Sequence, residues 1–191
     1  MHTLRSRLVY SNAWMSVRED DVELPDGSVG LYGVVDKQDL ALVLPSENGG
    51  FHLVEQFRYP VADRFWEFPQ GSWPASAEVA PPADGPGPRG PERLAATELR
   101  EETGLVADSL TYLGRVHVAH GYSNQGCHVF LAEGLTQWQP EREATEADMR
   151  QRWVSEDDLN LMITEGRFVD GLSLAALTLL DRTRRTRPPG P

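Results

Sequence analysis

The sequence predicts one principal domain of mixed α and β structure, an α/β (α+β) fold. A length of 191 residues with 40% hydrophobic residues is enough to bury one core. The N-terminal part alternates short runs rich in Val, Leu, Tyr and Phe with turn residues, which is typical of antiparallel strands. Apolar residues at helical spacing appear only from residue 92 onward.

The N-terminal part is expected to form a succession of strands. In "VELPDGSVG" the Pro fixes φ and the Gly permits a positive φ, so the chain turns there. A second turn is expected at "SENGG". The runs between and beside these turns predict strands near residues 8–18, 20–24, 28–36, 40–44 and 51–58. The apolar run "FWEFPQG" predicts one more short strand, which ends at its Pro and Gly.

Residues 72–92, "SWPASAEVAPPADGPGPRGPE", interrupt this pattern. They are mostly Pro, Ala and Gly, with little to bury, so we expect a flexible insert there, with a lid or partner-binding role as the alternative. After the insert, "ERLAATELREETG" predicts the first helix, which ends before Gly104. Later runs predict strands at 110–119, 126–135 and 150–154, and helices at 156–165 and 170–183.

Charge and cysteine content exclude several classes of protein. The formal net charge of −11 argues against a nucleic-acid-binding protein, which needs a basic surface. Cys127 is the only cysteine, so no internal disulfide is possible, which fits a reducing compartment. The N-terminus lacks the apolar core of a signal peptide, and no run is long enough to cross a bilayer. We therefore expect a cytoplasmic protein with neither nucleic acid nor membrane as a partner.

The segment "TELREETGL", residues 97–105, concentrates negative charge at the end of the first helix. Side chains three and four residues apart share a helix face, so Glu98, Glu101 and Glu102 are neighbours, whereas Arg100 points away from them. The carboxyl end of a helix is also the unfavourable end for anions. This crowding has two interpretations: an acidic face solvated by water, or oxygen ligands for a hard cation such as Mg²⁺ or Mn²⁺.

The same segment resembles the second half of the Nudix box, the motif of the Nudix hydrolases. The matching residues are Glu98, Leu99, Glu101, Glu102, Gly104 and Leu105. Other segments resemble the ADP-ribose pyrophosphatase branch of that family, namely "YSNAW", "LPDGS", "LVEQFRYPV" and "WEFPQG". The resemblance implies a Nudix-type α/β/α sandwich around a mixed sheet, preceded by a small N-terminal antiparallel β portion. We therefore expect an N-terminal portion at 1–38, a Nudix domain with its insert at 39–184, and a disordered tail at 185–191.

The sequence departs from the family pattern at two places. Thr97 stands where the family has an arginine that helps to hold a glutamate of the box. Gly71 matches the first glycine of the box, but the insert lengthens its distance from Glu98 in the sequence. The upstream glutamate of the pattern would fall in register on Arg89, and Glu92 is the substitute available nearby.

The resemblance also implies metal ligands and a catalytic group. Glu98, Glu101 and Glu102 would bind Mg²⁺ or Mn²⁺ together with a main-chain carbonyl at Gln70. Glu101 is also a candidate catalytic residue. Glu146, in the loop "EREATEADM", is the preferred candidate for the catalytic base, with Glu143 and Asp148 as neighbouring candidates. For any of these loop acids, simple solvation is the alternative interpretation.

Three residues are implied substrate contacts. Arg58 matches an arginine that contacts substrate phosphate in the branch, with a surface ion pair as the alternative. Glu67 is expected to contact the substrate or support the site, or else to face solvent from an alternating strand. Trp14 lies where an aromatic ring of the branch stacks on the base, with core packing or a dimer contact as the alternatives.

The function implied is metal-dependent hydrolysis of the pyrophosphate bond of a nucleoside diphosphate-linked small molecule, by a homodimer. ADP-ribose or a related nucleotide sugar is the expected substrate. The alternative is a nucleotide-binding sensor or regulator of the same fold that does not turn over its ligand. Thr97 and the interrupted box favour that alternative.

Overall fold

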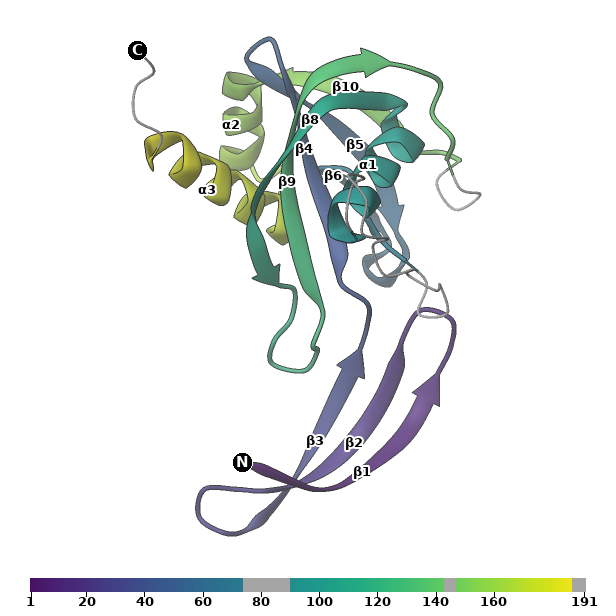
Figure 1. Cartoon of the computed structure of the whole chain (residues 1–191), viewed down its shortest axis with the longest axis vertical. Helices are drawn as coiled ribbons and strands as arrows, with labels where there is room; N and C mark the ends of the chain where they lie inside the picture. Colours follow the sequence, from purple (N-terminus) through teal and green to yellow (C-terminus); the bar gives the residue numbers. More distant parts are fainter. Residues whose placement is uncertain (74–89, 143–146, 187–191) are drawn as a thin grey trace, which may run out of the picture.

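The computed structural model describes residues 1–73, 90–142 and 147–186 (Figure 1). These residues form two β-sheets, three α-helices and a 3₁₀ turn at Tyr59–Val61. The smaller, N-terminal sheet extends away from the larger one, whose two faces are covered by helices (Figure 1). Most of the expected insert, together with Glu143 and Glu146, lies outside the described residues.

The N-terminal sheet is antiparallel and contains β1 (His2–Ser11), β2 (Ser16–Glu23) and β3 (Val29–Asp36) in that order. The prediction of one strand over 8–18 is wrong, because the chain reverses after Asn12. The carboxamide oxygen of Asn12 accepts hydrogen bonds from the main-chain N–H groups of Trp14 (2.8 Å) and Met15 (2.9 Å), a local turn that Asn forms readily. The turn predicted at "PDG" is confirmed, with Gly27 at a φ of 83°.

The larger sheet is mixed, as the resemblance implied. Its strands in spatial order are β10 (Arg150–Ser155), β5 (Gly50–Arg58), β4 (Leu40–Glu47), β9 (Gly126–Gln137) and β8 (Leu105–His117). Two short strands extend it, β6 (Asp63–Glu67) beside β5 and β7 (Gln70–Ser72) beside β4. β4 and β9 run parallel, whereas the other neighbours are antiparallel.

Helices cover both faces of this sheet. α1 (Gly90–Thr103) lies on one face, and α2 (Glu156–Thr164) and α3 (Gly171–Thr186) lie on the other (Figure 1). The core on the α1 face includes Ala41, Val43, Leu94, Leu99 and Phe130. The core on the opposite face includes Phe51, Phe68, Leu159, Ala176 and Leu180. The α/β/α sandwich is therefore confirmed. None of the helices in the described ranges is long and apolar enough to span a membrane.

The loop between β8 and β9 joins the two sheets. The main-chain N–H of Val35 donates to the carbonyl of Tyr122 at 2.7 Å. The side chain of Asn124 donates to Asp36 at 2.8 Å and accepts from the main-chain N–H of Lys37 at 3.1 Å. These bonds hold the link between β3 and β4, where the smaller sheet leaves the larger one.

Candidate active site

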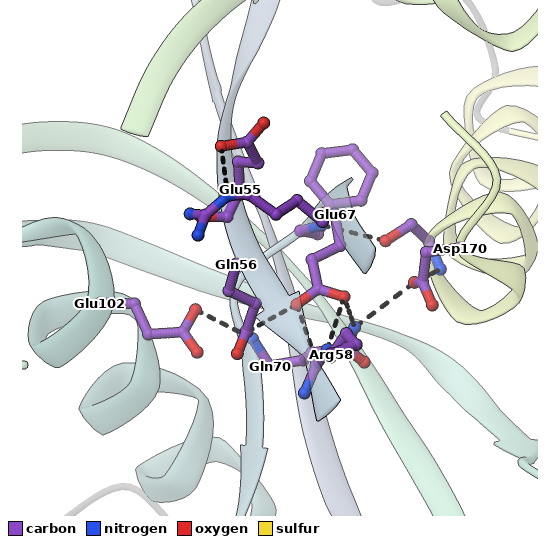
Figure 2. Close-up of polar contacts among 10 residues, drawn as sticks. Glu55, Gln56, Arg58, Glu67, Gln70, Glu102 and Asp170 are labelled. Carbon is purple, nitrogen blue, oxygen red and sulfur yellow. Dashed lines mark hydrogen bonds and ion pairs between the residues drawn. The ribbon is translucent and has the colours of Figure 1, made fainter. Parts of the chain in front are cut away.

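The acidic side of α1 meets β7. The Glu98 carboxylate packs so closely on Gly71 that a Cβ atom added at this glycine would collide with it. Glu102 is 1% exposed, and its carboxylate accepts a hydrogen bond from the main-chain N–H of Gln70 at 3.3 Å (Figure 2). The fold thus brings together the two segments of the interrupted motif, although the insert separates them in the sequence.

The carboxyl end of α1 is closed by Gly104 and by a segment much later in the chain. Gly104 has a φ of 70°, and its N–H donates to the carbonyl of Arg100 at 2.8 Å, the usual helix ending at a glycine. The carbonyl of Glu101 accepts from the N–H of Glu141 at 3.0 Å. The carbonyl of Glu102 accepts from Nε of Arg142 at 2.9 Å. Sequence reasoning missed Arg142.

Glu67 is the centre of a polar cluster beside these glutamates (Figure 2). Arg58 donates to both of its carboxylate oxygens, through Nη2 at 2.5 Å and through Nε at 3.2 Å. Gln56 donates to the same carboxylate at 2.6 Å. The Glu67 side chain is 2% exposed, so it does not face solvent, whereas Arg58 keeps 39% of its side-chain surface exposed. The ion pair therefore fixes one edge of the Arg58 guanidinium and leaves part of it accessible.

The charge state of Glu67 reflects two opposing influences. Burial raises the pKa of its carboxyl group because the charged form loses hydration, and nearby Asp170 acts in the same direction. Arg58 and Gln56 oppose this rise by stabilising the carboxylate, but the pKa stays raised. Perturbed acids of this kind, held beside an arginine, are frequent at functional sites.

Sequence reasoning also missed Gln56 and Asp170. The Gln70 side-chain amide lies 3.4 Å from Asp170 and 3.4 Å from Glu67, and so connects the two acids. Asp170 also accepts from the main-chain N–H of Ser173 at 2.8 Å. An acid three residues before such an N–H is a recognisable helix-start signal, but nothing local in the sequence indicates that it meets Gln70.

The remaining candidates lie elsewhere. Trp14 is in the turn between β1 and β2, 49% exposed, so it is not a core residue of this chain. Asp148 pairs with Arg64 of β6. Glu146 is outside the residues that the structure describes.

The chemical nature of the donor atoms at the end of α1 suits a hard divalent cation. Glu98, Glu101 and Glu102 together with the Gln70 carbonyl offer only oxygen donors, which Mg²⁺ and Mn²⁺ prefer. The contact between Glu98 and Gly71 brings this carboxylate against the main chain of β7. Within the described ranges, no three His, Cys, Asp or Glu side chains already converge as a complete ligand set.

Two family models match the chain. Residues 37–175 match the one described as NUDIX domain. Residues 1–35 match the one described as nucleoside diphosphate sugar hydrolase N-terminal domain.

Several known proteins are similar over most of their length. The ADP-ribose pyrophosphatase of Mycobacterium tuberculosis (strain ATCC 25618 / H37Rv) is 30% identical over 177 residues, covering 92% of this chain and 80% of that protein. The ADP-ribose pyrophosphatase of Bacillus subtilis (strain 168) is 30% identical over 145 residues, covering 75% and 72%. A solved structure described as "Crystal structure of ADP compounds hydrolase" matches with a TM-score of 0.76 at 16% identity, covering 96% of this chain and 93% of that one. This last match bears on the fold alone.

Proposed function

The chain belongs to the Nudix hydrolase family, and from this premise we propose that it hydrolyses the pyrophosphate bond of a nucleoside diphosphate derivative. ADP-ribose or a related nucleotide sugar is the proposed substrate, in line with the names of the two pyrophosphatases above. One observation carries the proposal. The acidic end of α1 lies against Gln70 and Gly71, beside an arginine that a buried acid holds in place.

We propose that Mg²⁺ or Mn²⁺ is held by the carboxylates of Glu98, Glu101 and Glu102 and by the main-chain carbonyl of Gln70. Such a cation, when bound, offsets phosphate charge and makes a bound water more acidic. The buried position of Glu102 and its hydrogen bond from Gln70 limit how far that carboxylate can move. Glu101 remains a candidate catalytic residue on the same face of α1.

Arg58 is the proposed phosphate-binding residue. A guanidinium suits bidentate contact with phosphate oxygens, and its accessible surface supports this role. Glu67 fixes the orientation of Arg58 through two hydrogen bonds, so we assign it to the support of the substrate site. Trp14 is the proposed stacking partner of the base, and its exposure in the β1–β2 turn supports that assignment.

Glu146 remains the proposed catalytic base. Support comes from the residues on either side of it. Arg142 contacts the carboxyl end of α1, and Asp148 is held by Arg64 of β6.

A homodimer and a cytoplasmic location complete the proposal. Every residue of β1 is exposed in the single chain, including Leu8 and Val9, and we assign these exposed apolar side chains to a subunit interface. The single cysteine, Cys127, is buried and fits a reducing compartment. The net charge of −11 supports partners other than nucleic acid.

The proposed activity is tested by incubating the protein with ADP-ribose and a panel of nucleotide sugars, with and without Mg²⁺ or Mn²⁺. We expect metal-dependent release of a mononucleotide, and a kcat at least about 100-fold lower for Glu102→Gln, because the variant loses a carboxylate that would hold the charge-stabilising cation. Glu133→Gln, an exposed acid of β9, is the matched control and keeps full activity. Tight ligand binding without any product would contradict the hydrolase and favour the sensor.

A further inference from the structure

The segment Gln137–Arg142 runs across the carboxyl end of α1 and bonds to its last carbonyl groups. Trp138 N–H donates to the carbonyl of Gly104 at 2.7 Å, and the Gln137 side chain donates to that of Thr103 at 3.0 Å. Glu141 N–H donates to the carbonyl of Glu101 at 3.0 Å. The last carbonyls of a helix have no partners within it, so this segment sets where the end of α1 lies.

Arg142 is the charged member of this segment and makes two main-chain contacts. Its Nε donates to the carbonyl of Glu102 at 2.9 Å, and its Nη1 donates to the carbonyl of Met149 at 2.7 Å. One rigid, planar guanidinium thus bridges α1 and the start of β10. Glu102 is held twice, at its carbonyl by Arg142 and at its carboxylate by Gln70.

The second acceptor of Arg142 is itself fixed to the larger sheet. Met149 is 4% exposed. The residue before it, Asp148, has its carbonyl bonded to Nη2 of Arg64 at 3.0 Å. The residue after it, Arg150, pairs with Glu55 of β5 as β10 begins. Arg142 therefore connects the acidic helix end to an anchored point rather than to a freely moving loop.

The charge of Arg142 also suits its place. A cation at the carboxyl end of a helix interacts favourably with the helix dipole, whereas the three glutamates at this end of α1 interact with it unfavourably. Thr97 cannot do this because its side chain is neutral. It lines a surface pocket of about 240 Å³ between α1 and β8, with Arg93 and Val106.

We propose that Arg142 is a positioning residue for the metal site, fixing the end of α1 so that Glu102 meets a divalent cation in one orientation. This role rests on the proposed function, since it requires a cation at the glutamates of α1. Arg142 touches neither substrate nor cation and acts through Glu102. It performs from a distant segment a task for which Thr97 is unsuited.

The test is a Mn²⁺ titration followed by the electron paramagnetic resonance signal of free Mn²⁺, with the unfolding temperature measured in parallel. Loss of a residue that orients a metal ligand typically weakens metal binding by about 10- to 100-fold, and we expect this for Arg142→Gln. Arg142→Lys keeps the positive charge but loses the planar guanidinium that reaches both carbonyls. We therefore expect this variant also to bind Mn²⁺ at least about 10-fold more weakly. Arg100→Gln is the matched control, because Arg100 lies on the same helix end and its side chain hydrogen-bonds to Glu141, not to a carbonyl of α1.

The outcomes separate the two proposals. Wild-type affinity in both Arg142 variants, or full recovery in Arg142→Lys, would overturn the positioning role of Arg142. If Arg142→Gln fails to fold, Arg142→Lys decides alone. If the wild-type protein binds no Mn²⁺, the proposed function is overturned, and the role of Arg142 with it.

Discussion

Glu67 is a buried acid whose ionised form depends on its neighbours Arg58 and Gln56. Its position in a short strand between Trp66 and Phe68 indicated an unusual acid, and the structure excludes the solvent-facing alternative. Its partners were not predictable, because Gln56 and Arg58 reach it only through the pairing of β5 with β6. The acidic face of α1 was predictable because Glu98 and Glu102 follow simple helical spacing.

The raised pKa of Glu67 predicts how stability depends on pH. The folded protein binds a proton at Glu67 more readily than the unfolded chain does, because burial raises the pKa above its ordinary value of 4.5. This contribution to the free energy of unfolding is fully present below pH 4.5 and is lost as the pH rises through the folded-state pKa of Glu67. Glu67→Gln removes it. Urea unfolding over a pH series should show the free energy of unfolding of the wild type falling, relative to that of the variant, as the pH rises above 4.5.

A control separates this effect from general charge loss. Glu133→Gln replaces an exposed acid of β9 in the same sheet. The stability of this variant should follow the pH dependence of the wild type. Parallel curves for wild type and Glu67→Gln over the whole series would contradict the assignment to Glu67.

Among the elements, the position at which α1 ends was predictable from the sequence. The hydrogen bonds that hold this end in place were not. Gly104 indicated the helix end because a positive φ suits glycine. The bonds from Glu141 and Arg142 were not predictable, since hydrogen-bond partners distant in sequence leave no local pattern. β8 likewise begins at Leu105, five positions before the prediction of 110, because pairing with β9 extends to Gln137 despite exposed polar residues.

The error at β1 and β2 has a different cause. Residues 8–18 contain enough β-rich residues to look like one strand, and a single Asn interrupts them. The side chain of Asn12 replaces two strand hydrogen bonds with a local turn. α3 continues to Thr186, beyond the predicted end at 183, and Arg184 in this last turn pairs with Glu156 at the start of α2.

At the scale of the whole molecule, the N-terminal sheet has little to pack against in a single chain. Leu8 is 65% exposed and Leu31 is 65% exposed. Burial of one leucine side chain stabilises an association by about 1.5–3 kcal/mol. We therefore expect a dimer in sedimentation velocity, and a monomer for Leu8→Asp. Leu161→Asp, a change at an exposed leucine of α2, serves as the control and should leave the dimer intact. A monomeric wild type would contradict the proposed interface.

Anomalous diffraction of crystals soaked in Mn²⁺ tests directly whether the acidic end of α1 binds a divalent cation. We expect a peak bounded by the carboxylates of Glu98 and Glu102 and the carbonyl of Gln70. The peak should disappear from Glu102→Gln crystals treated in the same way. A fully soaked wild-type crystal with no peak beside α1, or a peak that persists in the variant, would contradict the claim that the acidic end of α1 is a cation site.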